Sequence, residues 1–398
     1  MIPIARPTLD LAEADAAKRA ILSGWVSQGP EVAAFEREFA AYVGATNACA
    51  VSSCTAALHL ALLAVGVGID DEVVTVSHSY IATANAIRFC GAWPVFVDID
   101  PLTFNMDCNQ LARAVTARTK AILCVHQMGM PCDLDSILKT ARDHGLPLIE
   151  DAACAIGSEI LLDDAWQLIG RPHGDIACFS FHPRKVMTTG DGGMLTTANP
   201  EWDHMFRLWR QHGMSVPDTV RHASPEVTFE TYSMVGYNYR MTDIQAAVGR
   251  QQLRRLPDLL ARRRELADQY RSYLSEIPGV LPPFEPKWAH SNWQSYCVRL
   301  PEGLEQRAIM QFMLDRGIAT RRGIMCAHLE DAYRELDVRS PLPESEAAHL
   351  NCILLPLYAD MRQDEQKLVV DVFAEGCRRF LDKAAPSSRR LTDQASIA

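Results

Sequence analysis

The sequence predicts an α/β fold with a mostly parallel, mixed sheet of seven strands flanked by helices, followed by a smaller α+β unit. Short runs rich in β-branched residues alternate with helical patterns between residues 48 and 197, which is typical of a parallel sheet with helices on both faces. The expected strands cover residues 49–52, 73–76, 94–97, 121–125, 146–149, 176–180 and 194–197.

Helices are expected between these strands and after them. Amphipathic patterns cover residues 56–67 and 134–144, and a longer helical pattern covers residues 242–274. We expect the long helix to bend or break near Pro257, because proline removes a backbone N–H and its ring clashes with the preceding turn. Arginines between residues 254 and 264 alternate with leucines at helical spacing, which predicts that these arginines face solvent.

The pattern changes to the α+β unit after the proline-rich segment 282–286. A strand is expected at residues 296–300, followed by helices at residues 305–316 and 364–383.

Two domains and a tail are expected from this organisation. The length of 398 residues is sufficient for two hydrophobic cores. Residues 1–250 should form a large domain with an N-terminal arm, and residues 251–383 a small C-terminal domain. Residues 384–398 show no periodicity and are predicted to be disordered.

Composition excludes several classes of protein. Hydrophobic residues make up 48% of the chain and charged residues 22%, which is typical of a soluble globular protein. The net charge of −10 argues against a nucleic-acid partner. No apolar run is long enough for a membrane span or a signal peptide, so a cytoplasmic protein without a membrane partner is expected. Twelve cysteines without a C-x-x-C pair predict buried, reduced thiols and no metal site.

Lys185 and Asp151 carry the clearest chemical signal. Lys185 lies in a glycine-containing segment, residues 179–194, and Asp151 follows the expected strand at residues 146–149. A lysine that forms a Schiff base, together with an acidic partner for a pyridinium nitrogen, is the minimal equipment of an enzyme that uses pyridoxal 5'-phosphate (PLP).

Other strand ends add residues suited to the same cofactor, because ligands of parallel sheets bind beyond the carboxyl ends of the strands. Residues 52–57 open a helix after the first strand, so their hydroxyls and free N–H groups can bind a phosphate, although an ordinary helix N-cap is the alternative. Tyr80 follows the second strand and can stack on a flat ring or pack in the core. Ser180 ends the sixth strand, five residues before Lys185.

In the order of its motifs the chain resembles the sugar aminotransferase family, PLP enzymes of fold type I that build amino sugars and aminocyclitols from keto precursors. The resemblance covers most of the chain. Besides the segments around Asp151 and Lys185, it rests on residues 2–4, 23–30, 55–62, 91–98, 236–247 and 354–358.

The resemblance implies a role for each matching residue. Lys185 would form the Schiff base and move a proton between substrate and cofactor, and Asp151 would pair with the pyridine nitrogen. Asn238 would reach the phosphate bound by a neighbouring subunit, which implies a homodimer with shared active sites. The remaining cofactor contacts would be Tyr80, stacked on the ring, and Thr55, Ala56 and Ser180, at the phosphate.

Two positions depart from the family pattern. Cys54 stands where the family commonly has glycine, and Cys154 where it commonly has glutamine or histidine in contact with the phenolic oxygen of the cofactor. A thiol is a poor hydrogen-bond donor, so this contact should be weaker or made by another group.

The resemblance implies transfer of an amino group from glutamate or glutamine to a keto sugar, with a nucleotide-linked keto-deoxysugar as the expected acceptor. A cyclitol ketone or a related biosynthetic ketone is the alternative. Two other classes share parts of the pattern. A NAD-dependent oxidoreductase would need a G-x-G-x-x-G motif, which is absent after the first strand. A regulatory protein that binds PLP without catalysis would not need Lys185.

Candidate substrate contacts lie mostly in the second half of the chain. Arg240, Arg321 and Arg322 could offer positive charge to a diphosphate, with a structural or solvent-facing role as the alternative for each. His328 lies where relatives often place a substrate-contacting residue, with a packed or surface histidine as the alternative. The lysine retained at position 185 argues against the dehydratase branch of the family.

Overall fold

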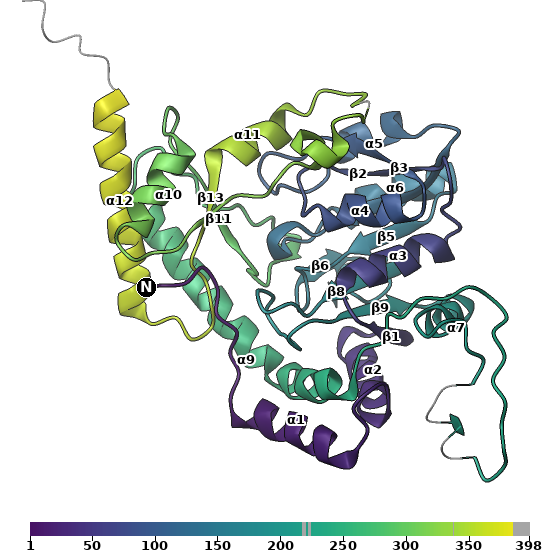
Figure 1. Cartoon of the computed structure of the whole chain (residues 1–398). Coiled ribbons are helices and arrows are strands. Elements are labelled where there is room, and N and C mark those ends of the chain that lie inside the picture. The colour runs from purple at the N-terminus through teal and green to yellow at the C-terminus, as the bar shows by residue number, and fades with distance from the viewer. Residues whose placement is uncertain (217–219, 222–223, 337, 385–398) are drawn as a thin grey trace, which may run out of the picture.

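A seven-stranded sheet lies at the centre of the larger part of the molecule (Figure 1). The computed structural model describes residues 1–216, 220–221, 224–336 and 338–384. The sheet has the order β1-β9-β8-β5-β4-β2-β3, and β9 runs antiparallel to both of its neighbours while the other pairs are parallel. The predicted mixed sheet and all seven of its strands are confirmed. Their bounds are β1 (Asn47–Val51), β2 (Glu72–Val76), β3 (Trp93–Val97), β4 (Thr119–Val125), β5 (Leu148–Asp151), β8 (Ile176–Ser180) and β9 (Gly193–Thr197).

Helices cover both faces of this sheet, so its strands are buried on both sides and consist of nearly continuous apolar runs. Phe39 and Ile137 pack on one face, and Leu58 and Phe206 on the other. None of the described helices is both long and apolar enough to cross a membrane. The helices of this part are α1 (Leu11–Ser23), α2 (Pro30–Val43), α3 (Cys54–Ala64), α4 (Ala82–Phe89), α5 (Cys108–Ala114), α6 (Leu134–His144) and α7 (Pro200–Trp209).

A hairpin that the sequence did not predict interrupts the alternation of strands and helices. Its strands β6 (Glu159–Leu162) and β7 (Ala165–Leu168) form a three-stranded sheet with β10 (Ala289–His290). These strands are short and largely accessible to solvent, so they lack the apolar run that identified the central strands. The hairpin links the larger part of the molecule to residues far along the chain.

The long helix α9 (Asp243–Leu274) crosses from beneath the large sheet into the C-terminal part (Figure 1). It continues through Pro257, so the predicted break there is wrong. Pro257 lies on the exposed side of the helix, where water can bind the carbonyl left without a helical N–H partner. A capping box at Thr242 and Gln245 fixes the start of the helix.

Arg263 departs from the prediction that the arginines of this helix face solvent. Its side chain is buried, and its guanidinium donates hydrogen bonds to the carbonyl oxygens of Trp293, Gln294 and Leu357. Burial lowers the pKa of Arg263 to about 10. Helical spacing predicted the helix correctly, but it did not reveal that a loop from the C-terminal part covers this position.

The C-terminal part is a small α+β unit, as predicted. Its sheet has the order β11-β13-β12, with both pairs antiparallel. Tyr270 of α9 packs in its core with Tyr296 and Phe373. Its elements are β11 (Tyr296–Arg299), α10 (Gln306–Leu314), β12 (Arg321–Arg322), α11 (Pro343–Asn351), β13 (Cys352–Leu355) and α12 (Gln363–Ala384).

The predicted domain boundary between residues 250 and 251 falls inside α9, which is one continuous helix with contacts in both parts of the molecule. The proposed division of the chain into two domains stays a prediction. The helix α12 ends at Ala384, the first residue of the predicted disordered tail, and residues 385–398 lie outside the described residues.

The N-terminal arm pairs with the C-terminal part. The N–H of Ile2 donates to the carbonyl of Gly317 at 2.7 Å, and the N–H of Ala319 donates back to Ile2 at 2.9 Å. The N–H of Leu357 donates to the carbonyl of Ile4 at 3.2 Å. Backbone hydrogen bonds therefore join the N-terminal arm to the C-terminal part.

Candidate active site

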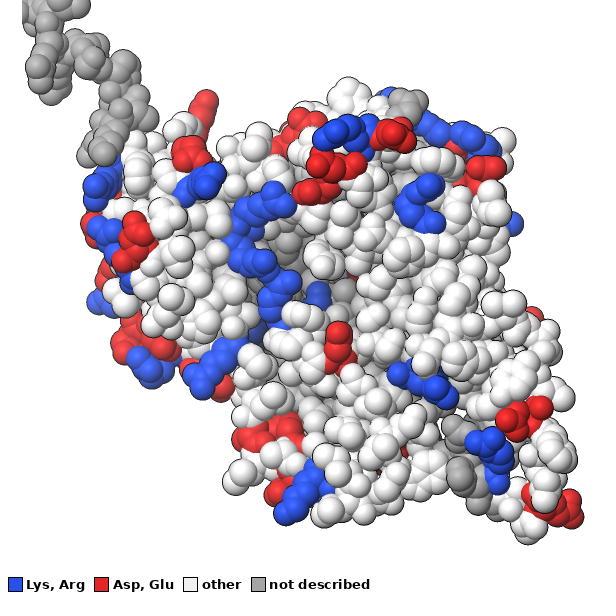
Figure 2. Space-filling model, viewed as in Figure 1, with Lys and Arg blue, Asp and Glu red and all other residues white. Residues whose placement is uncertain are grey.

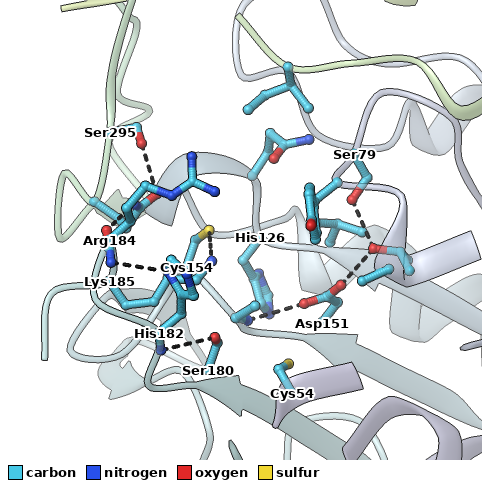
Figure 3. Close-up of a pocket in the computed structure, with 18 of the residues that line it drawn as sticks. Cys54, Ser79, His126, Asp151, Cys154, Ser180, His182, Arg184, Lys185 and Ser295 are labelled. Atoms are coloured by element: carbon cyan, nitrogen blue, oxygen red, sulfur yellow. Dashed lines mark hydrogen bonds between the residues drawn. The ribbon is translucent and has the colours of Figure 1, made fainter. Parts of the chain in front are cut away.

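A cavity of about 370 Å³ opens at the carboxyl ends of the parallel strands, where the sequence predicted a ligand site. Figure 3 shows Asp151, Cys154, Ser180 and Lys185 around it. Residues from the C-terminal part close the other side. The predicted site residues that line the cavity are Thr55, Tyr80, Asp151, Cys154, Ser180, Lys185 and Arg321.

Asp151 lies at the bottom of the cavity with a buried carboxylate. Its Oδ2 accepts a hydrogen bond from the Thr83 hydroxyl at 2.8 Å, and its Oδ1 accepts one from the N–H of Ala153 at 3.1 Å. The hydroxyls of Thr83 and Ser79 are 2.9 Å apart, which continues the network. Burial raises the pKa of Asp151, while the two hydrogen bonds act in the opposite direction. No cation forms an ion pair with Asp151 among the residues that the structure describes.

Lys185 approaches the cavity from the loop after β8. Its Nζ lies 3.1 Å from the Sγ of Cys154, and both side chains are half-buried. Burial alone would lower the pKa of the Lys185 amine, but the contact with Cys154 and the nearby Cys54 and Asp151 produce a net increase. The lysine and the carboxylate predicted from the sequence thus face one cavity, together with a sulfur atom.

The start of α3 forms the wall below Lys185. Ser53 is the N-cap of this helix, and its hydroxyl accepts the N–H of Ala56 at 3.2 Å. Ala56 is therefore not a free donor, and its side chain is buried away from the cavity. The half-buried Thr55 lines the cavity, and Ser180 faces it from the end of β8. The positive end of the helix points toward this corner of the cavity.

Besides Ala56, other predicted site residues lie outside the lining of the cavity: Asn238, Arg240, Arg322 and His328. Asn238 is exposed, and its Oδ1 accepts a hydrogen bond from the Nη2 of Arg240 at 3.1 Å. His328 lies with its Nδ1 2.6 Å from the hydroxyl of Ser77 and its Nε2 3.3 Å from Glu346. Both nitrogens of His328 are thus occupied by protein groups, as in the packed histidine that was the alternative.

His126 is a buried lining residue that the sequence did not single out. Its Nδ1 accepts the N–H of Cys132 at 3.0 Å, so its Nε2–H donates to Glu150, also at 3.0 Å. These partners fix the orientation of the ring beside the cavity. His126 directly follows β4, so the strand-end rule that selected Asp151 and Ser180 would also have selected this histidine.

A loop of residues 291–295 from the C-terminal part binds the backbone at Cys154 and next to Lys185. The buried amide of Asn292 donates to the carbonyls of Cys154 and Ile156, each at 2.8 Å. Gln294 donates to the carbonyl of Arg184 at 2.8 Å. No local sequence pattern indicates these contacts, because they depend on how distant segments pack.

Basic side chains gather at the mouth of the cavity. Figure 2 shows lysine and arginine side chains in a band along the hollow between the two parts of the molecule. Arg184 and Arg321 line the cavity, and neither forms an ion pair with an acidic residue of the described chain. Arg322 instead pairs with Glu330 at 3.3 Å. The arrangement is suited to an anionic ligand.

Comparison with known proteins identifies the family of this chain. The profile of the DegT/DnrJ/EryC1/StrS aminotransferase family matches residues 7–374. The chain belongs to this aminotransferase family. It is 38% identical to the spore coat polysaccharide biosynthesis protein SpsC of Bacillus subtilis over 380 residues, which cover 93% of this chain and 95% of SpsC.

Solved structures agree with the family assignment. The aminotransferase TlmJ of Streptoalloteichus hindustanus superposes with a TM-score of 0.87 at 34% identity, over 96% of this chain and 100% of TlmJ. The PLP form of a Streptococcus pneumoniae protein superposes with a TM-score of 0.87 at 29% identity, over 95% and 99% of the two chains. The protein is therefore an enzyme of the aminotransferase class with the PLP-dependent transferase fold. Membership of this family excludes the oxidoreductase considered from the sequence.

Proposed function

We propose that this enzyme uses PLP to move an amino group from glutamate or glutamine to a nucleotide-linked keto sugar. The observation that carries the proposal is that the Lys185 amine and the buried Asp151 carboxylate face the same cavity. Its volume of about 370 Å³ falls within the range of small-molecule sites.

The residues of the cavity fit PLP. Asp151 is a buried carboxylate without an ion-pair partner among the described residues, and a protonated pyridine nitrogen would supply the missing positive charge. Thr55, Ser180 and the positive end of α3 offer donors for a phosphate. The Tyr80 side chain is 66% exposed at the cavity, where it can cover the face of a ring.

PLP, when bound, supplies an electron sink for the bonds of the substrate amine carbon. Lys185 would hold the cofactor through its amine. Once displaced by the amino donor, its Nζ would carry the proton that moves between substrate and cofactor. Asp151 would hold a proton on the pyridine nitrogen, and Thr83 would keep the carboxylate in position. The loop 291–295 would restrict water on the side of the C-terminal part.

Free positive charge at the mouth of the cavity supports an anionic acceptor. Arg184 and Arg321 line the cavity without acidic partners, whereas many arginines of this chain form ion pairs. Two guanidinium groups match the two phosphates of a nucleotide-linked sugar, and the same groups could bind the carboxylates of the amino donor.

The assay that tests this proposal supplies 4-keto and 3-keto nucleotide sugars and cyclitol ketones as acceptors, with glutamate and glutamine as donors. We expect amination of a nucleotide sugar and none by Lys185→Ala. Replacing Arg184 or Arg321 with glutamine should raise KM for the nucleotide sugar more than it lowers kcat. Amination of cyclitol ketones alone would reject the proposed acceptor, and no amination of any ketone would reject the activity assigned here.

We also propose a homodimer with shared sites. Asn238 is exposed and lies outside the cavity of its own chain, which leaves it accessible to a second subunit. The segment before it exposes large apolar side chains: Val227 is 85%, Phe229 86% and Val235 87% exposed. Such residues are typical of a surface covered by a partner protein.

Mixing two inactive variants tests the shared site. Lys185→Ala and Asn238→Asp would each be inactive alone, the second because its carboxylate repels the phosphate. If each site takes Asn238 from the partner, a mixed dimer contains one site with both defects and one with neither. Subunit exchange should then restore about a quarter of wild-type activity. No recovery after exchange has been demonstrated by mass spectrometry would reject a shared site built with Asn238.

A further inference from the structure

Cys154 differs from the other cysteines of this chain in its surroundings. All twelve are free thiols, and ten of them are buried. Cys108, the other half-buried one, lies 3.7 Å from the carbonyl of Met106 and 3.9 Å from that of Asp133, and burial raises its pKa. Cys154 instead lines the cavity with its Sγ 3.1 Å from the amine of Lys185. Thiols that react with oxidants are accessible and lie beside a cation.

We propose that Cys154 and Lys185 are a redox modification site, at which peroxide joins the two side chains through a sulfur–nitrogen bond. In the first step the Cys154 thiol reacts with hydrogen peroxide, so sulfur is oxidised to a sulfenic acid, peroxide is reduced and one water is released. In the second step the Lys185 amine attacks this sulfur, the S–N bond forms, the S–O bond breaks and a second water leaves with a proton from the amine.

The surroundings of the pair favour the second step. Nitrogen and sulfur are already in contact, so the attack is intramolecular and needs only a small rotation of the flexible lysine side chain. An amine attacks as the free base. Burial disfavours the charged form of Lys185, and the contact with the Cys154 sulfur is the main influence that opposes burial.

The crosslink would switch the enzyme off, a consequence that rests on the proposed function of Lys185. An amine bound to sulfur cannot hold PLP. A small thiol reverses the state: it attacks the Cys154 sulfur, releases the Lys185 amine and leaves a mixed disulfide, which a second thiol reduces. Glutamine or histidine at position 154 could not form this bond, so the proposed response to peroxide depends on the cysteine that this chain has there.

Mass spectrometry of the peroxide-treated protein tests the proposal. We expect a loss of two hydrogen atoms that thiol treatment reverses, and a crosslinked pair of peptides that contain Cys154 and Lys185. The loss should be absent in Cys154→Ser and in Lys185→Arg. It should persist in Cys54→Ala, because a disulfide between Cys54 and Cys154 would cause the same change in mass, and in Cys108→Ser, which replaces the other half-buried thiol.

Two results would overturn the proposal: oxidation of Cys154 only to acids that never join Lys185, or a crosslink that depends on Cys54 and survives in Lys185→Arg. Saturating PLP should slow the crosslink if Lys185 holds the cofactor. An equal rate with and without PLP would support the crosslink and reject the cofactor role of Lys185. The mass readout requires neither turnover nor a known substrate, so failure of the proposed function and failure of the crosslink give different results.

Discussion

Replacing Thr83 with valine removes one of the two hydrogen bonds that the protein donates to the Asp151 carboxylate. The Thr83 hydroxyl lies 2.8 Å from Oδ2, and the N–H of Ala153 remains as the donor to Oδ1. Valine has nearly the shape of threonine, and the residue is 2% exposed, so water has little access to replace the lost donor. We expect the pKa of Asp151 to rise further, since this hydrogen bond acts to lower it.

The magnitude follows from the kind of bond that is lost. A hydrogen bond to a charged group contributes about 1.5–3 kcal/mol. If this stabilisation acts on the ionised carboxylate that pairs with a pyridinium, its loss should weaken PLP binding by roughly 10- to 100-fold. Thr83→Ser keeps the hydroxyl and should bind PLP nearly as tightly as the wild type.

Titration of the cofactor-depleted protein with PLP, followed by absorbance, measures this change. Thermal unfolding of the same proteins shows whether Thr83→Val has disturbed the fold rather than the site. Equal PLP affinity for the valine and serine variants, with both proteins folded, would refute the role assigned to the hydroxyl.

Three further predictions follow from other residues. Lys185→Ala should lose the visible absorption band of lysine-bound PLP but still retain PLP noncovalently after gel filtration; an unchanged spectrum would contradict the assignment. Asp151→Ala should lower kcat by several orders of magnitude with a much smaller loss of stability, and near-normal half-reaction rates with glutamate would count against it. Hydrogen bonds from Arg339 lower the pKa of Glu72 from 4.5 to about 2 in the folded state. The stabilisation of the folded state by ionised Glu72 is therefore complete above pH 4.5 and is lost as the pH falls toward 2. The free energy of unfolding of Glu72→Gln, measured in urea, should therefore fall less over that interval than the free energy of unfolding of the wild type.

The central sheet could be predicted because its strands are buried on both faces. Burial on both sides requires a run of apolar residues, and β2 and β5 are buried along their whole length. The hairpin of β6 and β7 gave no such signal, because these strands are partly exposed and β6 pairs with β10, more than a hundred residues away in the chain. The solvent-facing role predicted for Arg263 failed for a similar reason, since a distant loop covers it.

Strand ends allow residues of the cavity to be predicted from the sequence, whereas residues brought there by tertiary packing leave no such signal. Asp151 and Ser180 end their strands, so the topology of a parallel sheet brings them to one edge. Gln294 lines the same cavity from the C-terminal part, and Asn292 binds the carbonyl of Cys154. No spacing in the sequence relates these two residues to Lys185. The predicted roles of the cofactor contacts came from the family resemblance, and they stay predictions until the variants are measured.

The pairing of the N-terminal arm sets an order of events during synthesis. Ile2 leaves the ribosome long before Gly317, its hydrogen-bonding partner. Leu357, the partner of Ile4, is synthesised later still. Both Ile4 and Leu357 line the cavity, so its walls are complete only when nearly the whole chain has emerged. The cofactor should therefore be acquired after translation, and until then the unpaired arm and the open strand ends are available to chaperones and proteases.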